Sequence, residues 1–372
     1  MGDLTLIKSL GKDEFGEVFL TSKQGHKEKF LTRKIERKFA DDPKFKFIIE
    51  EIAILNKINH ENIIKLYELK KTSQNFYFVT EYCNGGNLAK YLEKYLETHK
   101  APFPEELVQH FMRQIVSAVK YLHDKRIIHR DIKLNYILVH FDSEEDKNNK
   151  NLLKAKVKII DFKFSRYLKK GELAKSILGS PINMDPSILR RLNKLGNSKE
   201  FGYDEKADIW SLGTMCYEML IGRSAFDAED MEELVSLVEK GNYFLPSTLS
   251  MEAVSFINGM LKYDPKKRFS SEQLYRHEFL NKNFTDFHKI NLNKIKENIK
   301  DSKIKMNTKL NETIWDILPE RYYNGIMLNG VGTQPESTFE GFRKKLSEES
   351  SDVVTDSDVC DSYIERKRSY IC

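Results

Sequence analysis

Two glycines five residues apart are the first feature that points to binding chemistry. Gly11 and Gly16 stand in the stretch LGKDEFGEV (residues 10–18), between two runs of strand-like residues. Glycine has no side chain, so its backbone can turn sharply and approach an anion closely. The pair predicts a candidate anion-binding loop, but by itself the spacing does not identify the anion.

A lysine and a glutamate follow on what read as neighbouring elements. Lys34 lies in the strand-like run LTRKI, and Glu51 lies seventeen residues later in a helical pattern. A buried lysine that holds phosphates needs a carboxylate to orient it, so Lys34 and Glu51 are a candidate ion pair. The alternative is that each is an exposed surface charge, which is the more common fate of either residue type.

The stretch HRDIK at 129–133, followed by DF at 161–162, gives this pattern its meaning. With the glycine loop and the lysine–glutamate pair before it, the chain resembles the protein kinase superfamily. The stretches ADIWSLGTMCYEML (207–220) and YDPKKRFS (263–270) match the same family. The resemblance covers roughly residues 4–280.

Finer features indicate a class within that family. Lys133, two residues after Asp131, is typical of the Ser/Thr class. The stretches DFKFSRYL and GSPINM, and the insert between two short strands, are most similar to the autophagy-initiating, unc-51-like kinases.

The resemblance implies roles for the charged residues. Asp131 would accept the proton of the attacking hydroxyl, and Lys133 would neutralise charge on the transferring phosphoryl group. Lys34 would hold the α- and β-phosphates, oriented by Glu51, and Asp161 would bind the metal ion. Phosphoryl transfer depends mostly on positioning and electrostatics, so each of these charges matters.

The resemblance also implies the cofactors and the nucleotide pocket. The cofactors would be ATP and Mg²⁺, with Mn²⁺ as an alternative. Adenine would lie between apolar side chains and bond to the backbone of the segment joining the two lobes. The implied cofactor-binding residues are Leu10, Gly11, Gly16, Val18, Lys34, Glu51, Glu81, Cys83 and Leu138. The family's internal hydrophobic stack would comprise Leu55, Leu66, His129 and Phe162.

Four positions depart from the family pattern. Asp13 replaces the middle glycine of the loop, and Tyr136 replaces the asparagine that ligates a second Mg²⁺, for which a phenol is a poor substitute. Lys163 replaces the glycine of the Asp-Phe-Gly motif; if that site needs a positive φ, a side chain costs of the order of 1 kcal/mol there. Ser187 replaces a glutamate that pairs with an arginine, here Arg268, which would need another partner or solvent.

These departures leave two interpretations open. The first is an ATP-dependent Ser/Thr protein kinase with reduced or unusual metal dependence. The second is a pseudokinase scaffold that binds nucleotide or partners without phosphoryl transfer. We hypothesise that the charge of Lys163 partly stands in for a metal ion by neutralising Asp161 or a phosphate; the alternative is a solvated lysine with no role.

Two serines in the region between Asp161 and Pro186 are candidate regulatory positions. Ser176 and Ser180 lie where the family carries its activation segment, and Arg130 could pair with a phosphate on Ser176. The alternative is that Ser176 is an ordinary loop serine.

The elements that must position these residues can be read from hydrophobic periodicity. They predict an α+β, bilobal, protein-kinase-like fold, with a small β-rich N-lobe (1–83), a larger helical C-lobe (84–280) and a partly disordered C-terminal tail (281–372). Strands are expected at 5–10, 17–23, 29–35, 62–69, 75–82, 136–141 and 156–162; helices are expected at 43–58, 88–98, 105–124 and over most of 205–280; and a surface loop is expected at 142–151.

Composition bounds the remaining questions. Of 372 residues, 40% are hydrophobic and 31% are charged, which is enough apolar material for a core. No apolar run reaches the ~18 residues that a membrane span needs, and the first residues do not form a secretory signal. The four cysteines show no metal or disulfide spacing. We therefore expect a cytoplasmic protein without a transmembrane segment.

The charge distribution bears on partners. The net charge of +5 comes from a mixed surface, and the basic stretch 282–309 lacks the interleaved aromatic residues that stack on bases. We therefore expect no nucleic-acid partner. The expected partners are a protein substrate with Ser or Thr side chains and a docking partner for the tail.

Overall fold

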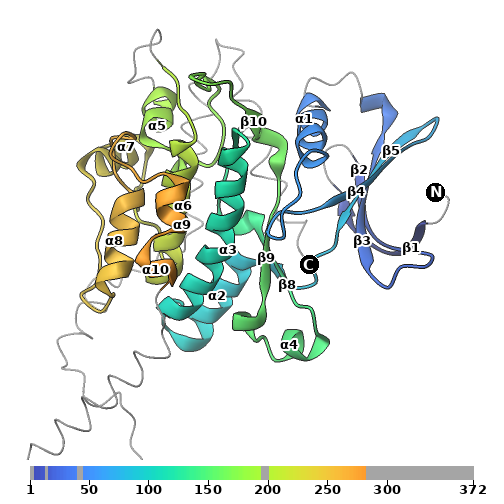
Figure 1. The fold of residues 1–372 in the computed structure, drawn as a ribbon, viewed down its shortest axis with the longest axis horizontal. Coiled ribbons are helices and arrows are strands. Elements are labelled where there is room, and N and C mark those ends of the chain that lie inside the picture. Colours follow the sequence, from blue (N-terminus) through green and yellow to red (C-terminus); the bar gives the residue numbers. More distant parts are fainter. Residues whose placement is uncertain (1–3, 13–15, 40–44, 194–200, 282–372) are drawn as a thin grey trace, which may run out of the picture. The chain divides into compact units, whose positions relative to one another are not determined.

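The computed structural model of the chain describes residues 4–12, 16–39, 45–193 and 201–281 (Figure 1). All of these residues belong to one compact unit. A β-sheet with one helix comes first in the chain, and a larger set of helices follows. The predicted α+β, two-part architecture is confirmed. Apart from Asn281, the predicted tail lies outside the described residues.

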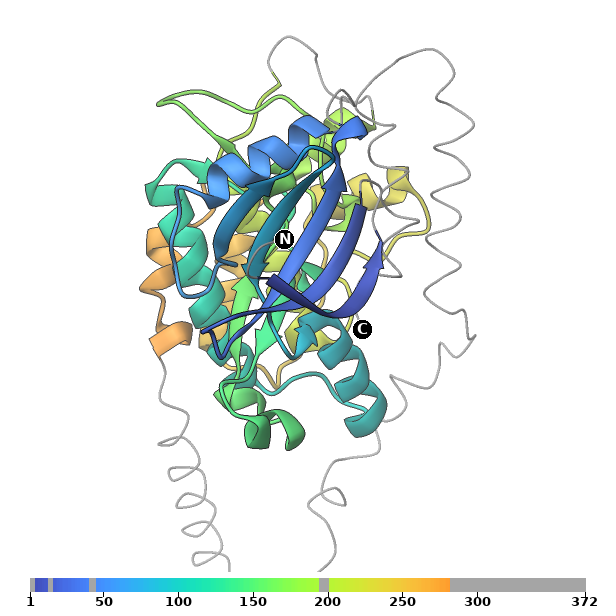
Figure 2. The ribbon, with the colours of Figure 1, turned by 90° about the vertical axis from the view of Figure 1, so that its right-hand side faces the viewer.

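The first part is built on a five-stranded antiparallel sheet with the strand order β1-β2-β3-β5-β4 (Figure 2). Half-buried and exposed residues alternate along β4, as expected of a strand with one solvated face. The strands are β1 (Leu4–Lys12), β2 (Gly16–Lys23), β3 (Lys29–Glu36), β4 (Leu66–Lys71) and β5 (Asn75–Glu81). All five expected strands of this region are present, and the sheet ends at Glu81, two residues before the expected lobe boundary.

Helix α1 (Phe45–Leu55) packs on this sheet. Its residues Phe45 and Ile48 are buried together with Ile35 of β3, which is completely covered. The three-residue spacing of Phe45 and Ile48 puts both side chains on one face of the helix. This contact sets the rotation of α1 about its axis, and Glu51, three residues after Ile48, lies on the same side and comes within 4.0 Å of Arg33 of β3.

The second part is a helical assembly around α6 (Lys206–Ile221), whose side chains are buried on almost every side. The long helix α3 (Glu105–Asp124) also contributes a fully buried face. The expected helices 88–98 and 105–124 are confirmed. The remaining helices are α2 (Leu88–His99), α5 (Pro186–Leu192), α7 (Met231–Lys240), α8 (Met251–Met260), α9 (Ser271–Tyr275) and α10 (Glu278–Asn281).

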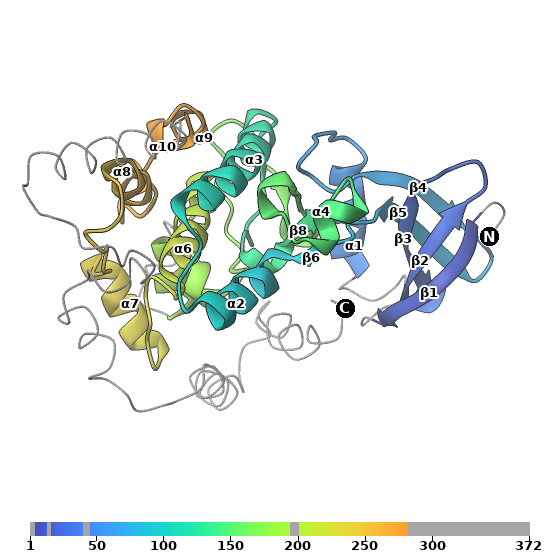
Figure 3. The same ribbon diagram turned by 90° about the horizontal axis from the view of Figure 1, so that it is seen from below.

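Short strands lie between the two parts, and the segments that carry the candidate catalytic residues follow them. Figure 3 shows β6 and β8 between the five-stranded sheet and the helices. A backbone bridge also pairs Ile63, just before β4, with Ile159. The short strands form two sheets, β6 (Gly86–Asn87) with β8 (Ile137–His140) and β9 (Lys156–Ile159), and β7 (Ile127–Ile128) with β10 (Arg166–Tyr167). The segments 129–136 and 160–165 therefore both begin at strand ends.

The insert between β8 and β9, expected to be a loop, contains a short helix, α4 (Glu144–Asn148). Ser143 caps it by accepting a hydrogen bond from the backbone N–H of Asp146. Three acidic residues in its first turn face the positive end of the helix dipole. The loop prediction was wrong here because it weighed polar composition and missed the capping signal.

The departure at Ser187 is compensated two residues earlier. Asp185 forms a buried ion pair with Arg268, whose side chain is completely buried and lies over the Trp210 ring at 5.1 Å. Ser187 donates its backbone N–H and its hydroxyl to the same Asp185 carboxylate. The expectation that Arg268 needs another partner is confirmed, and that partner is Asp185.

Two observations bear on the environment of the chain. In the described ranges, no helix combines the length and the apolar character that crossing a bilayer would need. Cys83 and Cys216 are both free and buried. Burial raises the pKa of the Cys83 thiol to about 12, so this thiol is unreactive at neutral pH.

Candidate active site

The segment that carries Asp131 is held by a buried carboxylate of α6. Asp208 accepts hydrogen bonds from the backbone N–H groups of His129 and Arg130, at 2.9 and 2.8 Å. Arg130 has a φ of +72°, a conformation that a non-glycine residue adopts only when its surroundings compensate. These two bonds supply that compensation and fix the direction in which the next residue, Asp131, projects.

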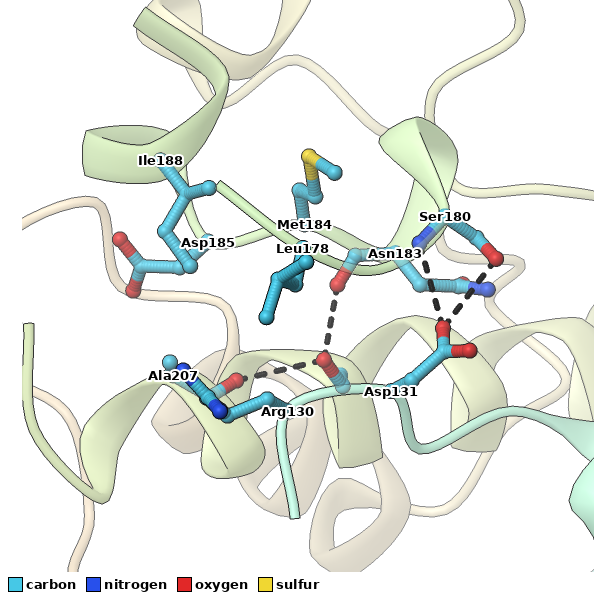
Figure 4. A pocket seen from close by; sticks show the side chains of 10 residues that line it. Arg130, Asp131, Leu178, Ser180, Asn183, Met184, Asp185, Ile188 and Ala207 are labelled. Atoms are coloured by element: carbon cyan, nitrogen blue, oxygen red, sulfur yellow. Dashed lines mark hydrogen bonds between the residues drawn. The ribbon is translucent and has the colours of Figure 1, made fainter. Parts of the chain in front are cut away.

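Asp131 accepts hydrogen bonds from Ser180 (Figure 4), and Lys133 joins the same group. The Lys133 ammonium lies 3.2 Å from Asp131 Oδ2. Ser180 donates its backbone N–H and its hydroxyl to Asp131 Oδ1, each at 3.2 Å, and Lys133 donates to the Ser180 hydroxyl oxygen. A carboxylate, an ammonium and a hydroxyl are thus gathered at one point.

Gly179 allows the segment before Ser180 to come this close. Its φ is +114°, and a Cβ there would lie 2.8 Å from the Arg130 carbonyl oxygen. A side chain at Gly179 would therefore push Ser180 away from Asp131. A small pocket opens beside this contact, with an apolar lining from Leu178, Met184, Ile188 and Ala207.

Asp161 lies at the end of β9 next to a lysine. The Lys163 ammonium is 3.7 Å from Asp161 Oδ2 and 4.8 Å from the centre of the Phe164 ring. Burial lowers the pKa of Lys163, while the negative charges of Asp161, Asp131 and Glu51 act against that shift. Lys163 is therefore not a solvated surface charge; its side chain is only 17% exposed.

The backbone strain predicted at Lys163 is at Asp161 instead. Asp161 has a φ of +68°, and Lys163 is not among the described residues with positive φ. Lys163 lies in the 3₁₀ turn Phe162–Phe164, where an ordinary side chain fits. The condition for the expected cost, a positive φ at position 163, is therefore not met.

Glu51 reaches this region from α1, but its partner is not the one predicted. Its Oε1 accepts a hydrogen bond from the Phe162 backbone N–H at 3.3 Å, and its Oε2 lies 4.0 Å from Nη1 of Arg33. Lys34 instead pairs with Glu17 at 3.6 Å. No ion pair joins Lys34 to Glu51 within the part of the chain that the structure describes, so the predicted pair is wrong.

The pKa of Glu51 reflects the burial of its carboxyl group. Burial is the main cause that raises the pKa of its carboxyl group, and the nearby charge of Asp161 adds to it. Arg33 and Lys163 act in the opposite direction by favouring the charged form. Glu51 is thus held between two cations and next to a second carboxylate.

The predicted loop glycines are on β1 and β2. Gly11 has a φ of +144° beside an irregularity in the β1–β2 pairing. A Cβ at Gly16 would lie 1.8 Å from the Lys34 carbonyl oxygen, so this glycine is required for the close approach of β2 and β3. Asp13 lies outside the described residues, and the prediction about its charge remains a prediction.

The other predicted cofactor-binding residues lie on the sheet, just after it and on β8. Val18 is a buried residue of β2, and Leu10 is the neighbour of Gly11 on β1. Glu81, at the end of β5, forms an ion pair with Lys158 of β9 at 2.7 Å. The other two predicted contacts are Cys83, buried after β5, and Leu138 on β8.

The expected internal stack is packed as one group. Leu55 and Phe162 are buried in the same hydrophobic core, and Leu66 packs against it. The rings of His129 and Phe162 meet edge to face with their centres 4.9 Å apart. Phe162 is completely buried, so this contact fixes the orientation of the segment that carries Asp161.

The side chains present do not fit a paired Mg²⁺ site. The first ligand, Asp161, has the Lys163 ammonium beside it, and Tyr136 stands at the second ligand position. Tyr136 is buried, and the Lys133 ammonium lies 4.3 Å from the centre of its ring. Throughout residues 4–12, 16–39, 45–193 and 201–281, no three His, Cys, Asp or Glu side chains gather in a way that could hold a metal ion.

Arg130 has partners in the place where a phosphate on Ser176 was hypothesised. Its guanidinium donates to the Phe164 carbonyl and, at 3.4 Å, to the Tyr203 hydroxyl. The Tyr203 hydroxyl donates in turn to the Ser176 carbonyl at 2.8 Å. Backbone hydrogen bonds between Ala174 and Tyr203 complete the contact. Whether Ser176 is phosphorylated stays a hypothesis.

Sequence reasoning missed three contributors to this site. Arg33 and Glu17 were not singled out, although each lies next to or near a predicted residue, and Tyr203 was not connected with Arg130. The signal for Arg33 was its position beside Lys34, because adjacent strand residues point to opposite faces.

Comparisons with known proteins agree with this arrangement. The family model for the protein kinase domain matches residues 4–280. The Serine/threonine-protein kinase atg1 of Dictyostelium discoideum is 32% identical over 295 residues, which cover 78% of this chain and 41% of that kinase. The human Serine/threonine-protein kinase ULK1 is 34% identical over 234 residues, which cover 62% of this chain and 21% of that kinase.

A third relative shows the breadth of the similarity. The Probable serine/threonine-protein kinase MARK-A of Dictyostelium discoideum is 31% identical over 281 residues, covering 75% of this chain and 24% of that protein. This chain therefore spans less than half the length of each of these three relatives.

Proposed function

Because the chain belongs to the protein kinase family, we propose that it transfers the γ-phosphate of ATP to Ser or Thr hydroxyls of a protein substrate. The observation that carries this proposal is the group around Asp131. A serine hydroxyl donates to the Asp131 carboxylate while the Lys133 ammonium contacts both. A substrate hydroxyl needs these same two groups at the same separation.

The proposed step uses them in fixed roles. Asp131 accepts the proton of the substrate hydroxyl, whose oxygen forms a bond to the γ-phosphorus. The bond from that phosphorus to the bridging oxygen of ADP breaks, and ADP leaves with the electron pair. Lys133 neutralises charge on the phosphoryl group during transfer. Ser180 must give up its hydrogen bond to Asp131 when the substrate hydroxyl enters.

We propose that this transfer has reduced or unusual metal dependence. The protein kinase family uses ATP with a divalent metal, but here an ammonium group lies at Asp161 and a phenol stands at the second ligand position. Lys163 and Lys133 supply positive charge where the family has a cation. Either Mg²⁺ or Mn²⁺ would then have a smaller effect on the rate than the lysines.

A pseudokinase scaffold is the second candidate. The specific observation that favours it is the loss of both paired-metal features at once, at Lys163 and at Tyr136. In that case the cleft would bind nucleotide or nothing, and the chain would act through its partners. The intact Asp131–Lys133 group favours the enzyme, because a scaffold has no need of a base and a cation at this distance.

The deciding experiment is a transfer assay with radiolabelled ATP and a general protein substrate. The full chain would be assayed with Mg²⁺, with Mn²⁺ and with a chelator, alongside Asp131→Asn. We expect transfer that Asp131→Asn abolishes and that the chelator reduces only partly. Nucleotide-induced thermal stabilisation without transfer under any condition would instead establish the scaffold.

We also propose a cellular location for this activity and a role for the C-terminal tail. Mixed surface charge and buried free thiols support a cytoplasmic protein. The tail, which lies outside the described residues from 282 onward, would dock a partner or a substrate. A pull-down of substrates by the chain with and without residues 282–372 tests that role.

A further inference from the structure

Two adjacent cations on β3 have different surroundings. Arg33 faces Glu51 of α1, with 4.0 Å between Nη1 and Oε2. Lys34 faces Glu17 of β2, with 3.6 Å between Nζ and Oε2. Neighbouring residues of a strand point to opposite faces of the sheet, so only one of the two can project towards the nucleotide.

The strand register identifies which face each occupies. Arg33 is directly opposite Val18 on β2 and Phe78 on β5, whereas Lys34 is opposite Glu17 and Tyr77. Cross-strand partners lie on the same face of a sheet. Arg33 therefore shares its face with Val18, the residue proposed to contact adenine.

Glu51 connects Arg33 to the segment that carries Asp161. One oxygen of Glu51 lies near the Arg33 guanidinium, and the other accepts the backbone N–H of Phe162, the residue after Asp161. Lys34 instead pairs with Glu17 on the other face of the sheet, and Glu17 is also paired with Lys12 at 3.0 Å. Glu51 thus joins the Arg33 guanidinium to the segment that carries Asp161.

We propose that Arg33, and not Lys34, is the side chain of β3 that binds the α- and β-phosphates of the nucleotide. This inference rests on the proposed function only in requiring that the cleft binds ATP. A guanidinium is planar, keeps its charge at every physiological pH and offers several N–H donors to phosphate oxygens. It can therefore contact Glu51 and a phosphate at the same time.

The test measures ATP binding to the full chain by calorimetry, without metal and with Mg²⁺. Adenosine, which lacks phosphates, is the second probe. We expect Arg33→Met to weaken ATP binding by about 10- to 100-fold and to leave adenosine binding within about twofold, as loss of one charged hydrogen-bonding group requires. Lys34→Met should change ATP binding by less than about threefold, because it removes a half-buried charge that pairs with Glu17 on the other face of the sheet.

Two further variants keep the result independent of folding. Arg33→Met leaves Glu51 in a largely buried position without this partner, so Arg33→Met with Glu51→Gln removes the uncompensated charge. This double variant should regain thermal stability and still bind ATP weakly. Arg33→Lys keeps the charge but loses the planar donor geometry, so an intermediate ATP affinity is expected.

Several outcomes would overturn the inference. They are a greater loss of ATP affinity in Lys34→Met than in Arg33→Met, an equal loss of ATP and adenosine binding in Arg33→Met, and no ATP binding by the unmodified chain. Failure of the proposed function is distinguishable, because it would appear as ATP binding that depends on Arg33 without phosphoryl transfer to protein.

Discussion

Two regions of this molecule have lost a family residue, and they respond differently. Around Arg268 the missing glutamate at position 187 is replaced by Asp185, which forms the same kind of ion pair from two residues earlier. Around Asp161 the missing metal ligand and glycine are replaced by Tyr136 and Lys163, which bring a phenol and a positive charge. The first region preserves its interaction, and the second changes its chemistry.

The difference follows from what each region must do. Arg268 is completely buried, and an unpaired buried charge is among the most destabilising features a fold can contain. Any substitution there must supply another carboxylate. The groups around Asp161 are partly accessible and neutralise one another, so several charge arrangements are compatible with folding and differ only in what they bind.

The largest effect is expected on breaking the buried ion pair. Asp185→Ala leaves Arg268 buried without its carboxylate, which should lower the free energy of unfolding by about 3–5 kcal/mol. Urea unfolding of the full chain measures it. Asp185→Ala combined with Ser187→Glu should recover most of that loss by restoring the family's placement. A loss below about 1 kcal/mol in Asp185→Ala would show that the pair is not what holds this region.

The second largest effect is expected at Lys163, where the chemistry changed. Lys163→Met keeps the length of the side chain and removes its charge, so ATP binding without metal should weaken by about 10-fold or more. Calorimetry with and without Mg²⁺ measures this, and Mg²⁺ should help the variant more than the unmodified chain. Lys169→Met, on the exposed surface, is the matched control. Equal metal dependence in both variants would contradict the role of Lys163.

A smaller effect is expected at Tyr136. Tyr136→Asn restores an amide oxygen at the second ligand position and removes the ring on which the Lys133 ammonium lies. We expect a several-fold greater stimulation of transfer by Mg²⁺. Tyr136→Phe keeps the ring and should behave like the unmodified chain. If Tyr136→Phe and Tyr136→Asn responded alike to Mg²⁺, the phenyl ring would not distinguish this site from the family's.

The sequence predicted most of what depends on order along the chain. The motif residues from Gly11 to Asp161 identified the family, and periodicity located the strands of the sheet and α3. The resemblance named Lys34 as the phosphate-binding residue, whereas the register places Arg33 on the face of Val18. A shift of one residue in a strand reverses every side chain, and the pairing of β3 with β2 and β5 fixes that register.

Other features depended on contacts between distant segments. The sequence identified Ser187 and Arg268 as a broken pair, but the position of Asp185 beside Arg268 emerges only when the start of α5 packs against the segment between α8 and α9. Nothing in the sequence indicated the positive φ at Asp161; the motif raised only the condition of a positive φ at Lys163, two residues later. The next residue, Phe162, packs its buried ring against His129, a contact that the resemblance implied but that does not specify the φ of Asp161.

The smallest effect is expected in a third region, where Arg130, Tyr203 and Ser176 are in contact. This region tests whether the activation segment keeps its interactions, as the Arg268 region does. Tyr203→Phe removes one hydroxyl that bonds to both Arg130 and the Ser176 carbonyl, so the local stability of the segment should fall by about 0.5–1.5 kcal/mol. Hydrogen exchange of residues 172–180 measures that loss. Ser176→Ala should leave exchange unchanged, because only the backbone of Ser176 takes part.

Greater exchange in Ser176→Ala than in Tyr203→Phe would mean that the serine side chain, and hence its modification, governs the order of the segment. The activation segment would then belong with the Asp161 region, where chemistry changed, and not with the Arg268 region, where the interaction was kept.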